Sequence, residues 1–197
     1  MLIYLHGFNS SPQSHKAQLF ARWMQGHGLG TQFACPELPH QPLQAIEVIE
    51  SEMARHRGEP LTLMGSSLGG FYATWLAEKY RARAVLINPA VLPHAGLRAF
   101  PAAQQNLHTG ERYELTEEHF LEWEQLVVPQ ITPELYLLLV ETGDEVIDYR
   151  EALQKYRGCR QVVVEGGDHT LKSFPEHFPL ILDFVGLGVG LLARPAE

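Results

Sequence analysis

Two adjacent serines, Ser66 and Ser67, lie in the glycine-rich stretch GSSLGG, and either of them could in principle act as a nucleophile. In the G-x-S-x-G pattern, the serine occupies a sharp turn between a strand and a helix, where larger flanking residues would clash. Ser67 has Gly65 two positions before it and Gly69 two positions after it, whereas Ser66 has no glycine at either position. The spacing therefore predicts Ser67 as the nucleophile and Ser66 as a neighbour that packs the turn.

A serine hydroxyl is a weak nucleophile, so it needs a basic partner and an acid that orients this base. His169 follows the last predicted strand and is the expected base. Asp144 follows the fifth predicted strand directly behind a glycine, where a turn can aim its carboxylate at the histidine. Three other acids compete for this role: Asp148 fits better as a helix cap, Asp168 is adjacent to the histidine, and Glu145 would point away. We therefore expect Asp144 to be the acid that orients the base.

Acyl transfer to a serine also requires two backbone N–H donors for the oxygen that becomes negatively charged. One donor is expected to be the amide of Leu68, the residue after the nucleophile. The other should come from the loop after the first strand, HGFN, where Phe8 is the first candidate and Asn9 the reserve. His6 lies in the same loop, and we expect it to bond nearby backbone rather than to act as the base.

These groups are positioned by an alternation of strands and helices along the chain. Continuous apolar runs such as 2–5 are typical of strands buried on both faces. Strands that alternate with helices predict an α/β fold with a parallel sheet, in which the loops at the carboxyl ends of the strands gather at one edge. The serine, acid and histidine loops would then meet there. The six predicted strands cover residues 2–5, 31–38, 61–65, 84–90, 135–141 and 161–166.

Capping patterns locate several of the helices. Ser11 is the expected N-cap of the first helix, with Pro12 at its first position and Gly28 past its end. Asp148 and Glu151 have the spacing of a capping box for a later helix. The glycine-rich tail from residue 186 onward is expected to be loose. The other expected helices cover 42–58, 68–80, 148–156 and 174–186.

Residues 91–134 separate two predicted core strands and are longer than a single crossover needs. We expect no strand in this insertion, one helix over 115–126 with Thr116 as its N-cap, and a lid over the carboxyl edge of the sheet. A lid helix must bury an apolar face over the site, so Phe120 and Trp123 are candidates for contact with an acyl chain. The insertion histidines, His119 among them, are expected to be solvated, with the cleft as the alternative.

Composition excludes several classes of function. The net charge of −8 argues against nucleic acid and against an anionic membrane as partners, because both need a basic face. Neither a secretion signal nor an apolar run of the length of a membrane span is visible, so a cytoplasmic protein is expected. Cys35 and Cys159 are expected to be free thiols. The histidines and cysteines lack metal-ligand spacing, so no metal and no cofactor are expected.

The stretches HGFNSS, GSSLGG, TGDEVIDYREA and EGGDH together resemble the α/β-hydrolase superfamily, in which serine, acid and histidine follow one another in this chain order. More closely, the chain resembles the small bacterial YqiA-type esterases, also grouped with the YcfP-like proteins. This resemblance implies one domain over 1–197 with a reduced α/β-hydrolase fold that lacks the first antiparallel strands. It also implies hydrolysis of acyl esters, with the triad on Ser67, Asp144 and His169.

Three functions stay open at this point. A serine esterase acting on a small-molecule acyl ester is the first expectation. The same triad could serve a thioesterase or an amidase, because a fold does not fix the reaction. A ligand-binding protein that keeps the pocket without turnover is the alternative from another class. The sequence predicts neither the oligomeric state nor the acyl chain length.

Overall fold

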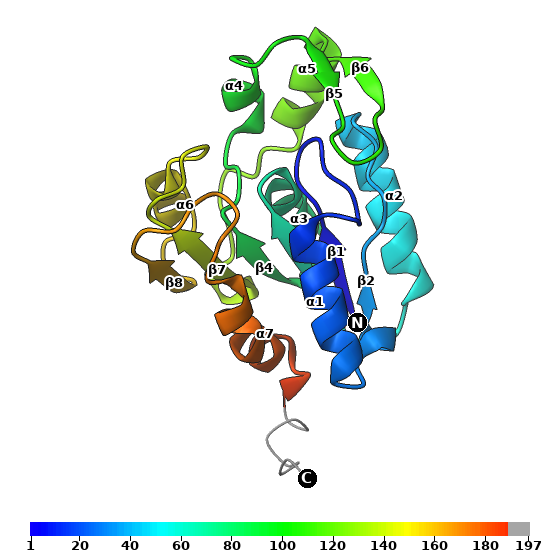
Figure 1. Ribbon diagram of the computed structural model, residues 1–197, viewed down its shortest axis with the longest axis vertical. Coiled ribbons are helices and arrows are strands. Elements are labelled where there is room, and N and C mark those ends of the chain that lie inside the picture. Colours follow the sequence, from blue (N-terminus) through cyan, green and yellow to red (C-terminus); the bar gives the residue numbers. More distant parts are fainter. Residues whose placement is uncertain (189–197) are drawn as a thin grey trace.

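A six-stranded parallel sheet forms the centre of the computed structural model, which describes residues 1–188 (Figure 1). The strand order is β2-β1-β3-β4-β7-β8, and every neighbouring pair is parallel. The prediction of six parallel strands flanked by helices is therefore confirmed. The strands are β1 (Leu2–Leu5), β2 (Phe33–Ala34), β3 (Thr62–Ser66), β4 (Arg83–Ile87), β7 (Tyr136–Glu141) and β8 (Arg160–Val164).

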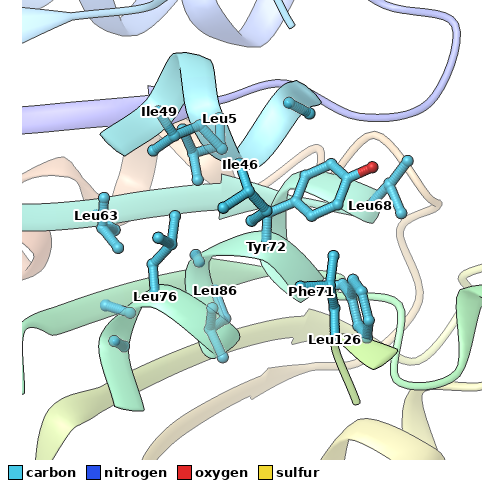
Figure 2. Packing of buried hydrophobic residues seen from close by; sticks show 14 of the residues in the cluster. Leu5, Ile46, Ile49, Leu63, Leu68, Phe71, Tyr72, Leu76, Leu86 and Leu126 are labelled. Carbon is cyan, nitrogen blue, oxygen red and sulfur yellow. The ribbon is translucent and has the colours of Figure 1, made fainter. Parts of the chain in front are cut away.

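Helices cover both faces of this sheet because alternate strand residues point to opposite sides. Leu2 and Tyr4 of β1 pack in one apolar cluster with α1 and α7, whereas Ile3 and Leu5 pack in the other with α2, α3 and α6. Figure 2 shows part of the second cluster, where side chains of α2 and α3 meet those of the central strands. The helices are α1 (His15–Gly26), α2 (Pro42–Arg55), α3 (Leu68–Tyr80), α6 (Tyr149–Lys155) and α7 (Phe178–Val185).

Several element boundaries differ from the predicted ones. The first helix begins at His15 with Ser14 as its N-cap, because the Ser11 hydroxyl accepts a hydrogen bond from the Gln13 amide and closes a turn instead. The second strand has only two residues, since it pairs solely with β1 and Pro36 follows shortly after it. The segment predicted as one final helix is a short 3-10 helix, Phe174–His177, followed by α7. Most of the predicted loose tail, 189–197, lies outside the described residues.

The insertion contains a hairpin that the sequence did not predict. Its two strands are β5 (Ala103–Gln105) and β6 (Arg112–Glu114), which pair antiparallel beside the helices α4 (Pro93–Leu97) and α5 (Glu117–Gln125). The expectation of no strand was wrong because each strand has only three residues, most of them polar and exposed, so no apolar alternation marks them. In Figure 1 these elements lie together at the top of the molecule, above the end of β1.

The N-cap of α5 is the predicted one, but the second residue of its capping box is unusual. Thr116 is the N-cap, and His119 takes the place that glutamate usually has in a capping box, with its Nδ1 accepting a hydrogen bond from the Thr116 amide at 3.1 Å. The other ring nitrogen of His119 is 2.9 Å from Nδ1 of His40. His119 is therefore buried between the cap and His40, not solvated as expected. No helix among residues 1–188 is long and apolar enough to cross a membrane.

Candidate active site

Ser67 occupies the turn between β3 and α3 with a backbone conformation of φ +54° and ψ −120°. A positive φ is uncommon for a residue with a side chain and is typical of a strained nucleophile turn. The two flanking glycines are required by close approach of the chain. A Cβ on Gly65 would lie 2.2 Å from the carbonyl oxygen of Gly69, and a Cβ on Gly69 would lie 2.0 Å from that of Leu5. The structure therefore contains the turn that the G-x-S-x-G spacing predicts.

Backbone hydrogen bonds hold this turn in place. The amide of Ser67 donates to the carbonyl oxygen of Ile87 at 3.0 Å, and its own carbonyl oxygen accepts from the amides of Gly70 and Ala90. These contacts join the turn to the end of β4 and to the loop that follows it. Ser66 is the last residue of β3 and is buried, in agreement with a packing role.

Asp144 and His169 form a close pair beside Ser67. Nδ1 of His169 is 2.8 Å from Oδ2 of Asp144, whose side chain is 1% exposed. The other carboxylate oxygen accepts hydrogen bonds from the amides of Val146 and Ile147 at 2.9 and 2.8 Å. Burial alone would raise the pKa of Asp144, but the hydrogen bonds from His169 and the two amides outweigh it and hold that pKa below its ordinary value. Because an ionised carboxylate only accepts, Nδ1 of His169 donates, and Nε2 is left to accept a proton.

The competing acids have other partners. Asp148 caps α6 by accepting a hydrogen bond from the Arg150 amide at 3.0 Å, as predicted for a helix cap. Asp168 pairs with the ammonium group of Lys172 at 2.8 Å. Glu145 accepts from the backbone amide of His169 at 3.0 Å, so it contacts the histidine loop without reaching the ring. Of these four acids, all within the described part of the chain, Asp144 is the one that bonds the imidazole.

The two predicted oxyanion donors lie at the same place as the serine. Phe8 and Leu68 line one cavity together with Ser67 and His169. Within residues 1–188, the amides of Phe8 and Leu68 make no hydrogen bond to another protein group, so both are available to a substrate oxygen. Leu68 is the first residue of α3, where backbone amides have no partner inside the helix.

His6 has the structural role that the sequence predicts. Its Nε2 accepts a hydrogen bond from the Leu38 amide at 3.0 Å, and its Nδ1 is 3.1 Å from the carbonyl oxygen of Gly7. Burial lowers the pKa of His6 to about 4. The ring is therefore neutral at physiological pH and fixes the loop that carries the Phe8 amide.

Asn9 ties this loop to the insertion, a role that the sequence did not reveal. Its side-chain amide donates to Oε1 of Gln104 at 2.8 Å, and its side-chain oxygen accepts from the Tyr113 hydroxyl at 2.7 Å. The carbonyl oxygen of Ser10 accepts a third bond, from the side chain of Asn106. The hairpin is thus fastened directly to the predicted oxyanion loop.

Two cavities of different character meet at Ser67 and His169. The larger, about 500 Å³, is lined mainly by apolar side chains of the insertion and of the loop after β7. The smaller, about 360 Å³, is bordered by serine, threonine, histidine and lysine residues of the loop before α1, of α1 itself and of the histidine loop, although apolar atoms contribute more of its surface than polar atoms do. The apolar lining includes Val91, Leu92, Leu97, Phe100, Leu107 and Ile147. The polar lining includes Ser10, Ser14, His15, Lys16 and Thr170.

Phe120 and Trp123 do not line either cavity, contrary to expectation. Trp123 is fully buried, and its indole N–H donates to the Tyr72 hydroxyl at 2.9 Å. Phe120 packs against Trp123 and beneath the guanidinium of Arg98. The apolar face of α5 is therefore used to dock the insertion on α3, and the residues around α4 form the cavity wall instead.

The sequence also missed Glu141 and Asn88, which hold the histidine loop. Glu141, the last residue of β7, is 1% exposed, and its carboxylate accepts hydrogen bonds from the amides of Asp168, Lys172 and Ser173 at 2.8, 3.0 and 2.8 Å. Burial would raise the pKa of Glu141, but these bonds outweigh it and lower that pKa. The only available signal was a carboxylate at the end of an otherwise apolar strand.

Asn88 completes this support from the end of β4. Its side-chain oxygen accepts from the Glu141 amide at 3.1 Å, and its side-chain amide donates to the carbonyl oxygens of Asp168 and His169 at 3.2 and 3.3 Å. Asn88 has a positive φ of 40°, which asparagine tolerates better than most residues. The position of the His169 backbone is thus set by side chains from β4 and β7.

The parallel sheet, the strained serine turn after β3 and the histidine–aspartate pair after the last two strands define an α/β-hydrolase fold. Within that class, the chain belongs to UPF0227, described as "Uncharacterised protein family (UPF0227)", whose sequence profile matches residues 1–186. The resemblance to the YqiA-type and YcfP-like proteins is thereby confirmed at the level of the family.

Individual relatives agree with this assignment. The UPF0227 protein PC1_2487 of Pectobacterium carotovorum subsp. carotovorum (strain PC1) is 24% identical over 193 residues, which cover 95% of this chain and 100% of that protein. Among solved structures, mouse alpha/beta hydrolase domain-containing protein 10 superimposes with a TM-score of 0.70 at 18% identity, covering 94% of this chain and 88% of the other. A structure from the metagenome-derived lipolytic enzymes LipS and LipT gives 0.66 at 19% identity, covering 94% and 92%. These two structures share the fold of this chain.

Proposed function

We propose that this protein is a serine ester hydrolase in which Ser67, His169 and Asp144 form a catalytic triad. The observation that carries the proposal is the His169–Asp144 pair at 2.8 Å, beside a serine on a strained turn at the meeting point of two cavities. A histidine with one ring nitrogen bonded to an ionised acid and the other left to accept a proton is what serine activation requires.

The reaction would proceed through an acyl-enzyme. Oγ of Ser67 attacks the carbonyl carbon of the ester while its proton passes to Nε2 of His169. The amides of Phe8 and Leu68 stabilise the negative oxygen of the tetrahedral intermediate. The intermediate expels the alcohol, whose oxygen takes the proton from His169, and leaves the acyl group on Ser67. Water, deprotonated by His169, then attacks the acyl group and releases the acid and the free serine.

Labelling with a fluorophosphonate tests the nucleophile, because this reagent phosphonylates an activated serine. We expect one adduct, located on Ser67 by mass spectrometry of the digested protein. Ser66→Ala is the matched control and should keep the adduct, whereas Ser67→Ala should lose both the adduct and ester hydrolysis, the latter by on the order of 10⁴-fold or more. An adduct on another residue, or undiminished hydrolysis by Ser67→Ala, would refute the proposal.

The same triad could act on thioesters or amides, so the bond that is cleaved needs its own comparison. Hydrolysis rates are measured for an oxygen ester, a thioester and an amide that share one acyl group. We expect the oxygen ester to be hydrolysed fastest, the thioester second and the amide slowest. A protein that binds these compounds tightly but turns none of them over would be a ligand-binding member of the fold, and the proposed esterase would then be wrong.

A further inference from the structure

Lys16 stands out among the residues of the smaller cavity, because it places a cation beside Ser67 and His169. Its ammonium group donates to the carbonyl oxygens of Thr170 and His169 at 3.1 and 3.4 Å. An ammonium group has three N–H donors, so these two contacts leave one N–H for another partner. The proposed chemistry, which needs only the triad and two backbone amides, does not use this group.

The charge of Lys16 is not taken up by a carboxylate. Within residues 1–188, no carboxylate oxygen lies within 4.0 Å of its ammonium nitrogen. The three acids whose charges act on it have partners of their own: Asp144 bonds His169, Asp168 pairs with Lys172, and Glu141 accepts three backbone amides. A half-buried cation with a spare donor at the edge of a cavity is suited to bind an anion.

The residue types on the walls of the two cavities differ, and this difference indicates which half of an ester each cavity would take. The larger cavity has an apolar lining, which suits a hydrocarbon acyl chain, and several of its rim residues, such as Leu107 and Val146, are more than half exposed. The smaller cavity has serine, threonine, histidine and lysine side chains on its wall. Thr170 of the histidine loop lines the smaller cavity and not the larger one, and the neighbouring His169, which lines both, must deliver its proton to the alcohol oxygen.

We propose that the smaller cavity is a subsite for the alcohol half of the ester, a proposal that rests on the proposed function. In this subsite, Lys16 binds a negatively charged group of the alcohol. The apolar acyl chain lies in the larger cavity. The substrate class is thus an ester between an apolar carboxylic acid and an anionic alcohol, with a carboxylate or a phosphate as the charged group.

Three esters with eight-carbon acyl groups test this subsite. The first is the octanoyl ester of 4-hydroxybenzoate, with the charge on the alcohol half, and the second is the neutral octanoyl ester of 4-hydroxybenzamide. The third is a monoester of octanedioic acid with 4-hydroxybenzamide, which carries the charge on the acyl half. For each ester, kcat/KM of the wild type is divided by that of Lys16→Met, so that differences in intrinsic reactivity cancel.

We expect Lys16→Met to reduce kcat/KM for the first ester on the order of tenfold more than for the other two, as expected for one ion pair in a partly solvated site. Lys16→Arg, which keeps the charge, should retain the preference. Lys155→Met is the matched control: Lys155 also donates to two backbone carbonyls, those of Val128 and Pro129, but lines neither cavity. It should leave the ratio between the esters at the wild-type value.

Two outcomes would overturn the subsite. An equal loss on all three esters in Lys16→Met would mean that Lys16 only supports the histidine loop. A loss concentrated on the octanedioic monoester would place the anion on the acyl half. The proposed function would fail if the wild type hydrolysed none of the three esters and formed no fluorophosphonate adduct on Ser67. Hydrolysis of the neutral ester without any preference that depends on Lys16 would refute the subsite alone.

Discussion

Replacement of Glu141 by glutamine tests whether this carboxylate positions His169. Its two oxygens accept three backbone amides of the histidine loop, two on Oε2 and one on Oε1. Glutamine has nearly the same shape but only one accepting oxygen, and its NH₂ group would face an amide donor on the other side. In the better orientation it keeps the bonds from Asp168 and Lys172 and leaves the Ser173 amide without an acceptor.

The expected cost follows from these contacts. One buried amide left without a partner costs about 1–3 kcal/mol. The two remaining bonds change from a charged to a neutral acceptor and lose about half their strength, or about 1 kcal/mol together. We therefore expect Glu141→Gln to lower the free energy of unfolding by about 2–4 kcal/mol at neutral pH. A loosened histidine loop should also lower kcat on the order of tenfold, with a smaller effect on KM, because displacement of a catalytic group by about 1 Å is costly.

Urea unfolding at several pH values gives the first quantity. Burial alone would raise the pKa of Glu141, but its hydrogen bonds lower this pKa in the folded protein. The carboxylate therefore stabilises the folded protein fully above the ordinary pKa of 4.5, and this stabilisation is lost as pH falls through the pKa of the folded state. The difference in unfolding free energy between wild type and Glu141→Gln should be constant at neutral pH and shrink below about pH 4.5. Glu165→Gln, at an exposed glutamate of the same loop, should change neither stability nor kcat. Wild-type stability and kcat in Glu141→Gln would refute the positioning role.

Three further predictions address other parts of the site. Asp144→Asn should reduce ester turnover on the order of 10³–10⁴-fold, measured by steady-state kinetics, because an amide no longer selects the histidine tautomer that accepts a proton; a loss under tenfold would contradict this. Gly69→Ala should lower the Tm strongly or prevent folding, since its Cβ would lie 2.0 Å from a backbone oxygen of β1, whereas Gly26→Ala, with open space around the Cβ, should be tolerated. Burial lowers the pKa of Lys16 to about 8, so the preference for the anionic alcohol should decline as pH rises through about 8, and a pH-independent preference would speak against a lysine-bound anion.

The serine turn was predictable from the sequence because its determinants are local. The clash that demands Gly65 and Gly69 arises within one strand–turn–helix unit, and the resulting spacing is visible in a short stretch. The central strands of the parallel sheet were predictable for a similar reason, since burial on both faces produces a continuous apolar run such as that of Leu2–Leu5. The short, exposed strands β5 and β6 have no such run and were missed. The Asp144–His169 pair could be predicted because both residues follow the last two predicted strands, and because the turn behind Gly143 favoured Asp144 over the other acids. In the structure these strands, β7 and β8, are neighbours in the sheet.

The rest of the site depends on contacts between segments far apart in the sequence. Glu141 and Asn88 bond a loop that lies many residues away, and nothing near either residue marks that partnership. The apolar residues of α5 show the same limit: the sequence reveals that Phe120 and Trp123 must be buried, but not whether the partner is a cavity or α3. Burial of a polar side chain at the end of an apolar strand costs free energy unless the side chain is hydrogen-bonded. Such a residue therefore indicates a hydrogen-bond partner elsewhere in the fold.

The insertion contacts the proposed site in two ways, through hydrogen bonds to the loop after β1 and through apolar side chains on the wall of the larger cavity. The hairpin is bonded to the oxyanion loop through Asn9, which accepts from Tyr113 and donates to Gln104, so the Phe8 amide depends on the hairpin for its position. The segment around α4 supplies most of the apolar wall of the larger cavity, to which Leu107 of the hairpin also belongs. The ring of Phe100 in this segment packs edge-on against Phe8. Under the proposed function, larger side chains in that segment should narrow the space for the acyl group, whereas loss of the two Asn9 hydrogen bonds should weaken the stabilisation of the oxyanion.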